Sequence, residues 1–227
     1  MKLVQVALWL QFAEAMHIHS LSQQIFTILG GKSEEPEPVI ERNVWLRIHK
    51  GKMTVSWTPT SCQIASEEIS DISNTKQYID RIISILETIN GVAKIEKLRN
   101  KRLLTYWILP TPQYDFVSLE RKYREMMITK NDISNTAYDS SAVFDIRRDE
   151  WILHHQSGAM EPKQLQQTYL NFKLDNLPRT FVFLEASLFD DHMIEYSRGE
   201  VYSFMEKALG DCISHMEEFN RICGGCL

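Results

Sequence analysis

The C-terminal part of the chain reads TFVFLEASLFDDHMIEYSRGEVYSFMEKALGDCISHMEEFNRI over residues 180–222. Its first residues, Phe181 to Leu188, form a nearly unbroken apolar run of the kind found in a central strand of a sheet. From residue 198 onward, apolar side chains recur at intervals of three and four residues, which predicts one long amphipathic helix over 198–222. A buried strand followed by a helix with a wide apolar face indicates a sheet covered by helices.

The segments before this stretch complete a unit of strand, helix, strands and helix over residues 95–222. Pro110 and Pro112 stop a strand-like run, and apolar residues at helical spacing follow them. We therefore expect a strand at 103–109, a helix at 116–128, and strands at 141–147, 150–155 and 180–188. A long connection from Ser157 to Leu177 precedes the last strand.

The same order of elements is found at the N-terminus, over residues 3–91. Val4, Val6 and Leu8 begin an alternation at a period of two residues, which favours a strand over the apolar core of a signal peptide. The expected elements are a strand at 3–12, a helix at 16–29, a hairpin of 43–49 and 53–57 that turns at Lys50-Gly51, a short strand near 62–64, and a helix at 75–90 that ends at Asn90-Gly91.

These units predict an α+β fold with two similar halves, residues 1–92 and 93–227. Each half should place helices on one face of a mostly antiparallel sheet, and the two sheets can then pair. Residue identity between the halves is negligible, so the internal duplication is inferred from the order of elements alone.

The composition is that of an ordinary globular protein. Apolar residues make up 44% of the 227 residues and charged residues 24%, which argues against a disordered chain. No stretch approaches the ~18 apolar residues of a membrane span, so we expect no membrane partner. The net charge of -5 makes nucleic acid an unexpected partner for the whole surface, and the four cysteines fit a reducing cytoplasm better than a disulfide scaffold.

The C-terminal cysteines form the sharpest local pattern, C-x2-H-x7-C-x2-C. Its members, Cys212, His215, Cys223 and Cys226, have the donor types of a structural zinc site. The alternative is that Cys212, which lies on the apolar stripe of the last helix, is a small buried hydrophobe. Zinc is the one cofactor that the sequence leaves open, and no other cofactor is expected.

Signals for catalysis are weak. The chain has no G-x-S-x-G elbow and no glycine-rich phosphate loop before a helix. Two groups combine histidine with carboxylates, but neither has a known metal-ligand spacing: Glu14, His17 and His19, and His154, His155, Asp190, Asp191 and His192. A metal-dependent hydrolase is therefore a third hypothesis, and no catalytic residue is assigned.

A basic stretch before the strand at 103–109 is the best signal for nucleic acid. Cations can neutralise phosphates while an aromatic ring stacks on a base, and the candidate residues are Lys94, Lys97, Arg99, Lys101, Arg102 and Trp107. The alternative is a solvated strand end, since Glu96 dilutes the charge and cations at a sheet edge discourage aggregation.

The order of elements also resembles a family of bacterial proteins. The resemblance is carried by an arginine-bearing strand from Ile95 to Leu109, and by an apolar strand from Phe181 to Asp190 that leads into a long terminal helix with His215 and Phe219. The family is sporadically distributed and uncharacterised, its members have about this length, and it implies no established activity.

Taken together, the sequence favours a non-enzymatic cytoplasmic protein. We expect it to act through a protein partner or as a homo-oligomer, as a subunit or regulator of a bacterial complex such as a defence system. Exposed edge strands or the helix carrying Met126 and Met127 are the expected docking surfaces. A nucleic-acid-binding module that uses residues 94–107 is the alternative.

Overall fold

The computed structural model describes residues 1–13, 24–25, 27–28, 46–50, 52–70, 75–127, 140–147 and 151–223, with the backbone alone described for 46–50. The strands are β1 (Lys2–Phe12), β2 (Leu46–Lys50), β3 (Met53–Thr58), β4 (Ser61–Ser70), β5 (Lys97–Pro110), β6 (Ser141–Arg147), β7 (Ile152–Met160), β8 (Phe181–Asp190) and β9 (Ile194–Glu195). The helices bounded within these ranges are α2 (Thr75–Ala93), α3 (Phe116–Met127), α5 (Pro162–Thr168) and α6 (Arg198–Cys223).

Eight of these strands form one antiparallel sheet in the order β2-β3-β4-β1-β5-β8-β7-β6, and the short β9 pairs with β5. The predicted α+β class is confirmed. The sheets of the two predicted halves join edge to edge in one continuous sheet, because β1 and β5, the first strands of the two halves, pair along nearly their whole length. Counted outward from this central pair, the order is β1-β4-β3-β2 on one side and β5-β8-β7-β6 on the other.

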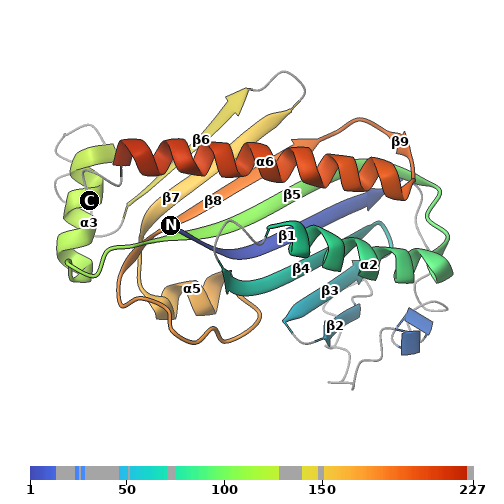
Figure 1. Ribbon diagram of the computed structural model, residues 1–227, viewed down its shortest axis with the longest axis horizontal. Coiled ribbons are helices and arrows are strands. Elements are labelled where there is room, and N and C mark those ends of the chain that lie inside the picture. Colours follow the sequence, from blue (N-terminus) through green and yellow to red (C-terminus); the bar gives the residue numbers. More distant parts are fainter. Residues whose placement is uncertain are drawn as a thin grey trace.

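One face of the sheet is covered by helices. In Figure 1, α6 runs across the sheet and α2 lies beside it. Alternate strand residues such as Leu8, Ile64, Leu103 and Leu184 are fully buried against the helices in one large hydrophobic cluster. Burial of each such side chain stabilises the fold by about 1.5–3 kcal/mol. We call this side, under α2, α3 and α6, the covered face, and its opposite the open face.

The short helix α5 packs on the open face, contrary to the expectation that all helices share one face. Leu165 of α5 joins a second cluster with Val4, Ile108 and Phe183, which alternate with covered-face residues along their strands. The buried carboxylate of Glu67 also holds the chain after α5, because it accepts hydrogen bonds from Asn171 and Phe172. The predicted long connection from Ser157 to Leu177 therefore contains the end of β7 and this helix.

Several boundaries differ from the predictions: the short strand expected near 62–64 is the ten-residue β4, and the strand expected at 150–155 continues to Met160 as β7. The helix expected to end at Asn90-Gly91 continues to Ala93. Lys94, with φ of 53°, takes the left-handed conformation at its end, and the Asn90 side chain accepts a hydrogen bond of 2.8 Å from the Ile95 amide. The strand expected from 103 begins at Lys97, and most of the helix expected at 16–29 lies outside the described residues. Among the helices that the structure describes, none is long and apolar enough to span a bilayer.

Candidate functional site

A line of side chains crosses the open face near the middle of the sheet. Strand register places Trp9 of β1 beside Arg102 of β5, Arg102 beside Phe189 of β8, and Phe189 beside Ile152 of β7. Directly opposed residues on neighbouring strands lie about 5 Å apart, so their side chains can touch. We call Trp9, Arg102, Phe189 and Ile152 the transverse row. It joins two aromatic rings, one cation and one aliphatic side chain.

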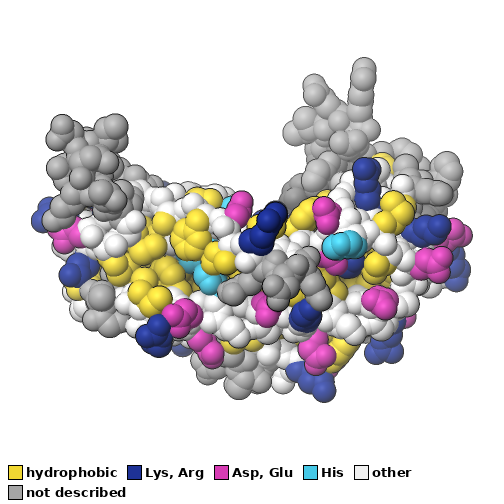
Figure 2. Space-filling view, turned by 90° about the horizontal axis from the view of Figure 1, so that it is seen from above, with side chains coloured by type: hydrophobic (Ala, Val, Ile, Leu, Met, Phe, Trp, Pro, Cys, Tyr) yellow, Lys and Arg dark blue, Asp and Glu magenta, His cyan; other side chains and the backbone are white. Residues whose placement is uncertain are grey.

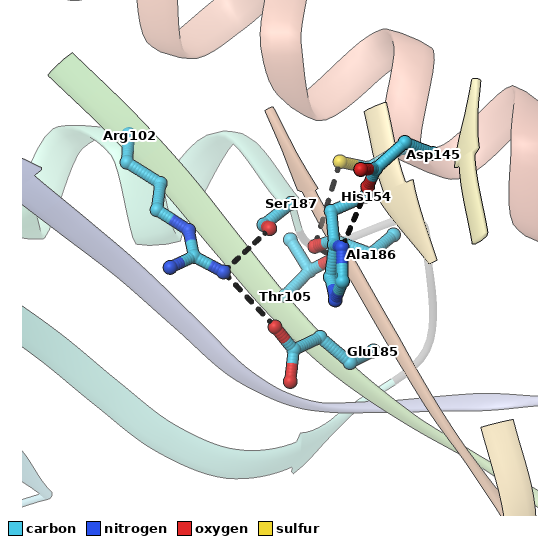
Figure 3. Close-up of polar contacts among 8 residues, drawn as sticks. Arg102, Thr105, Asp145, His154, Glu185, Ala186 and Ser187 are labelled. Carbon is cyan, nitrogen blue, oxygen red and sulfur yellow. Dashed lines mark hydrogen bonds and ion pairs between the residues drawn. The ribbon is translucent and has the colours of Figure 1, made fainter. Parts of the chain in front are cut away.

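Arg102 is held in a fixed orientation by β8. Its Nη2 donates hydrogen bonds to Glu185 Oε1 at 3.1 Å and to Ser187 Oγ at 2.8 Å, as Figure 3 shows. The arginine side chain is 40% exposed, whereas that of Glu185 is 10% exposed. Burial raises the pKa of Glu185, and the positive charge of Arg102 opposes that rise. Arg102 is therefore both anchored and accessible.

The transverse row borders a hollow in the open face. The hollow has a volume of about 260 Å³ and is lined by Ala7, Trp9, Gln63, Arg102, Leu104 and Phe189. Ala7 and Leu104 oppose each other on β1 and β5, two positions along the strands from Trp9 and Arg102 and on the same face. A small alanine between larger aromatic and cationic side chains explains why the surface is recessed here.

A histidine and an aspartate extend the open face toward its edge. His154 of β7 opposes Asp145 of β6, and its Nδ1 lies 2.7 Å from Asp145 Oδ1. His154 also opposes Ser187, the hydroxyl that anchors Arg102, and Figure 3 places these side chains near one another. The polar side chains of β5, β8, β7 and β6 therefore lie side by side across the open face.

The edge strand β6 is exposed on both of its faces. Val143 points to the open face and is 55% exposed, and Phe144 points to the covered face and is 38% exposed. Within the described part of the chain, β6 pairs with β7 alone. Figure 2 shows hydrophobic side chains gathered on the side of the molecule where β6 and the end of α6 lie. A row of main-chain donors and acceptors at such an edge can pair with another strand.

The predicted zinc ligands have separate surroundings. Cys212 is fully buried, with its Sγ 3.8 Å from the Ala186 carbonyl oxygen, and burial raises its pKa to about 12. Cys223 is buried, and Cys226 lies outside the described residues. Among the residues that the structure describes, Cys212, His215 and Cys223 do not come close enough to share a metal ion. This arrangement matches the buried-hydrophobe alternative for Cys212.

His215 instead belongs to a polar chain buried on the covered face. Its Nε2 lies 2.9 Å from Nδ1 of His155, and His155 Nε2 lies 2.8 Å from Ser157 Oγ. Ser157 Oγ is also 2.8 Å from the hydroxyl of Tyr123. Burial, and then the neighbouring His215, lower the pKa of His155 to about 3, so the ring is neutral. Phe144 stacks on it at 4.3 Å between centroids. This hydrogen-bonded network joins β7 to α3 and α6. Because Ser157 is fully buried, its hydroxyl is not an accessible nucleophile.

The second histidine and carboxylate group is divided in the same way. His154 and His155 point to opposite faces of the sheet. Asp190 forms a salt bridge with the buried Lys101, with 3.0 Å between Oδ2 and Nζ. Asp190, Asp191 and His192 do lie together, but Asp190 is already engaged by Lys101 and by His192 at 2.8 Å. The first group, Glu14 with His17 and His19, lies outside the described residues.

Strand alternation also divides the predicted basic set. Lys101 is 3% exposed, and Trp107 is fully buried with its Nε1 donating to Thr105 Oγ1 at 2.9 Å. Both face α6 on the covered face. Lys94, Lys97 and Arg99 are exposed at or before the start of β5, and Arg102 lies on the open face. The hydrogen-bonding groups of Lys101 and Trp107 are therefore engaged inside the protein.

Trp9, Glu185 and Phe189 are not among the site residues predicted from the sequence. The signal for Trp9 is its place between Leu8 and Leu10, which puts it on the face opposite the core. Glu185 stands inside an apolar strand, where a carboxylate requires a partner.

No protein-family model matches the chain, and a comparison with curated proteins finds no significant match. The function is therefore inferred from the geometry of the open face and of its β6 edge.

Proposed function

We propose that the protein is a non-enzymatic binding protein that acts through a protein partner. The partner adds an extended segment to the edge of β6 and places apolar side chains against the open face beside it. The exposed β6, which pairs with β7 alone within the described part of the chain, is the observation that carries the proposal. Strand addition to a free edge is a recurrent mode of protein recognition, with affinity from main-chain hydrogen bonds and specificity from side-chain contacts.

The side chains of β6 suit this role. Ser141 to Phe144 carry no charge, and the two charged residues, Asp145 and Arg147, lie at the other end of the strand. Charged side chains along an edge normally discourage pairing, so the uncharged half of β6 is the part best able to accept a strand.

The open face supplies apolar contact area next to this edge. Ile152 is 47% exposed and Phe189 is 38% exposed, and the two oppose each other on β7 and β8. Aromatic side chains and arginine are typical of the residues that dominate binding energy at protein interfaces, and Ile152 adds apolar area beside them.

Purification of the tagged protein from its native cells, with mass spectrometry and nuclease controls, tests the proposal. Ile152→Asp should lose the partner, because a carboxylate would be desolvated in the interface. Val117→Asp is the matched control: Val117 is 60% exposed on α3, away from the open face, so this variant should retain the partner. Binding must then be reproduced with the two purified proteins. Retention of the partner by Ile152→Asp, or equal loss in both variants, would refute the proposed surface.

A nucleic-acid-binding module is the second candidate. Lys94, Lys97 and Arg99 are exposed where the chain enters β5, and Arg102 follows on the open face. A gel shift at low salt with single-stranded and double-stranded DNA and RNA tests it, because phosphate contacts are strongest there. Absence of any shift, or a shift that survives replacement of all four cations by alanine, excludes this candidate.

We also propose that the two halves descend from one duplicated unit. The matching order of strands on the two sides of β1 and β5 supports this origin.

A further inference from the structure

We infer that the hollow beside Arg102 is a ligand site for a small molecule that joins a flat apolar ring to a carboxylate or a phosphate. This site shares Phe189 with the proposed partner surface, but its Arg102 and Trp9 lie three and four strands away from the β6 edge, and its test needs no partner. The two proposals can therefore fail independently.

Recognition of the anion is assigned to Arg102. A guanidinium group has five N–H donors in a planar fork. The hydrogen bonds to Glu185 and Ser187 both use Nη2. Within the described part of the chain, Nε and Nη1 of Arg102 make no hydrogen bond. Both edges that bind an anion through two parallel hydrogen bonds include Nη2, which is occupied, so Nη1 and Nε are each left to donate single charge-assisted hydrogen bonds to a carboxylate or phosphate.

Recognition of the ring is assigned to Trp9 and Phe189. The register places them on the two sides of Arg102, one on β1 and one on β8. A flat apolar ring can stack against either aromatic side chain or against the guanidinium plane. Ala7 and Leu104 also line the hollow, and their side chains add apolar contact without hydrogen-bonding groups.

The dimensions limit the ligand. A volume of about 260 Å³ lies just below the ~300–1,000 Å³ of typical small-molecule pockets, so one substituted ring fits better than a dinucleotide. Gln63, on the far side of Trp9, is the polar residue in the lining that can contact a further substituent.

Glu185 makes binding dependent on charge. Its carboxylate compensates Arg102 at 3.1 Å, so an incoming anion must compete with it. Replacement of Glu185 by Gln removes the negative charge and leaves an oxygen that can still accept from Nη2. A site that binds anions should therefore become tighter in Glu185→Gln, whereas a merely structural ion pair predicts no binding in either protein.

The test is a titration of small-molecule probes into the full-length chain, monitored by nitrogen–proton correlation NMR spectra. The probes are benzoate and phenyl phosphate, with benzyl alcohol and inorganic phosphate as the ring alone and the anion alone. We expect saturable shifts of the Trp9 indole N–H and the Arg102 Nε–H with benzoate, phenyl phosphate or both, and the effective probe identifies the anion. Either half-molecule should bind at least about tenfold more weakly, as expected for loss of one charge-assisted contact or one stacked ring.

Variants decide between a site and an unspecific effect. Arg102→Ala should weaken binding at least about tenfold, and Arg99→Ala should bind like the unmodified protein. Arg102→Lys should give an intermediate loss, because it keeps the charge without the planar guanidinium group and its several N–H donors. Glu185→Gln should bind several-fold more tightly. If Arg102→Ala does not fold, Trp9→Leu takes its place and should also weaken binding. The inference is overturned if neither aromatic anion gives a saturable shift, or if Arg102→Ala, or Trp9→Leu in its place, binds as well as the unmodified protein.

Discussion

Lys101 and Arg102 are neighbours in β5, yet they point to opposite faces of the same sheet. Lys101 is buried between Asp190 and the ring of Phe204, whereas Arg102 is anchored on one side and accessible on the other. His154 and His155 differ in the same way on β7. The comparison shows that one kind of residue serves stability on the covered face and is available for binding on the open face.

The largest difference is expected for two tryptophans. Trp107→Ala on the covered face should lower the free energy of unfolding by about 3–5 kcal/mol, because it leaves a large cavity and removes the hydrogen bond from the indole to Thr105. Trp9→Ala on the open face should cost about 1 kcal/mol or less, since that ring is already partly in solvent. Urea unfolding of both variants measures the two values, and equal losses would contradict the division of the sheet into a covered and an open face.

The neighbouring cations should differ next. Lys101→Ala removes one partner of a largely buried ion pair and should cost about 3 kcal/mol, because Asp190 is left without its cation. Arg102→Ala should cost less, about 1 kcal/mol, because Arg102 is 40% exposed and the raised pKa of Glu185 lets that carboxylate take up a proton when its cation is removed. The same unfolding measurements apply, and a larger loss for Arg102→Ala than for Lys101→Ala would reverse the comparison.

A pH-dependent difference is expected for the two histidines. The pKa of His155 falls to about 3 in the folded protein from an ordinary value of 6.5. Between these two pH values His155 is protonated in the unfolded chain and neutral in the folded protein. The contribution of the buried neutral ring to stability is therefore fully present above pH 6.5 and is lost as the pH falls toward 3. The loss is at most about 1.4 kcal/mol per pH unit.

Replacement of His155 by Gln should reduce the slope of stability against pH in this range. The exposed His154→Gln is the control and should change the slope little. Unfolding free energies at a series of pH values between 6.5 and 3.5 provide the measurement. An unchanged slope in His155→Gln would show that burial of this ring does not govern the acid sensitivity.

Much of the fold could be predicted because local patterns determine it. The alternation in β1, the apolar run of β8 and the stripe of α6 each depend on burial of nearby residues, so the sequence displays them directly. The joining of both halves in a single sheet could not be predicted from local patterns, since the pairing of β1 with β5 joins residues about a hundred positions apart. The end of α2 was misplaced because Lys94, and not a glycine, takes the left-handed conformation.

The candidate site was harder to predict than the fold. The alternation in β5 shows that Lys101 and Arg102 diverge, but it does not tell which of them α6 covers. The contacts that define their roles come from β8, more than eighty residues away in the chain. The same holds for His155, whose partner His215 is carried by α6.

Hydrogen–deuterium exchange of the copurified complex, compared with the free protein, tests the central proposal most directly. If the partner adds a strand to the edge of the open face, exchange of the β6 amides from Ser141 to Arg147 should slow in the complex, while exchange along α2 and α6 stays unchanged. Protection of α2 or α6 without protection of β6 would show that the partner docks on the covered side, and would contradict the account.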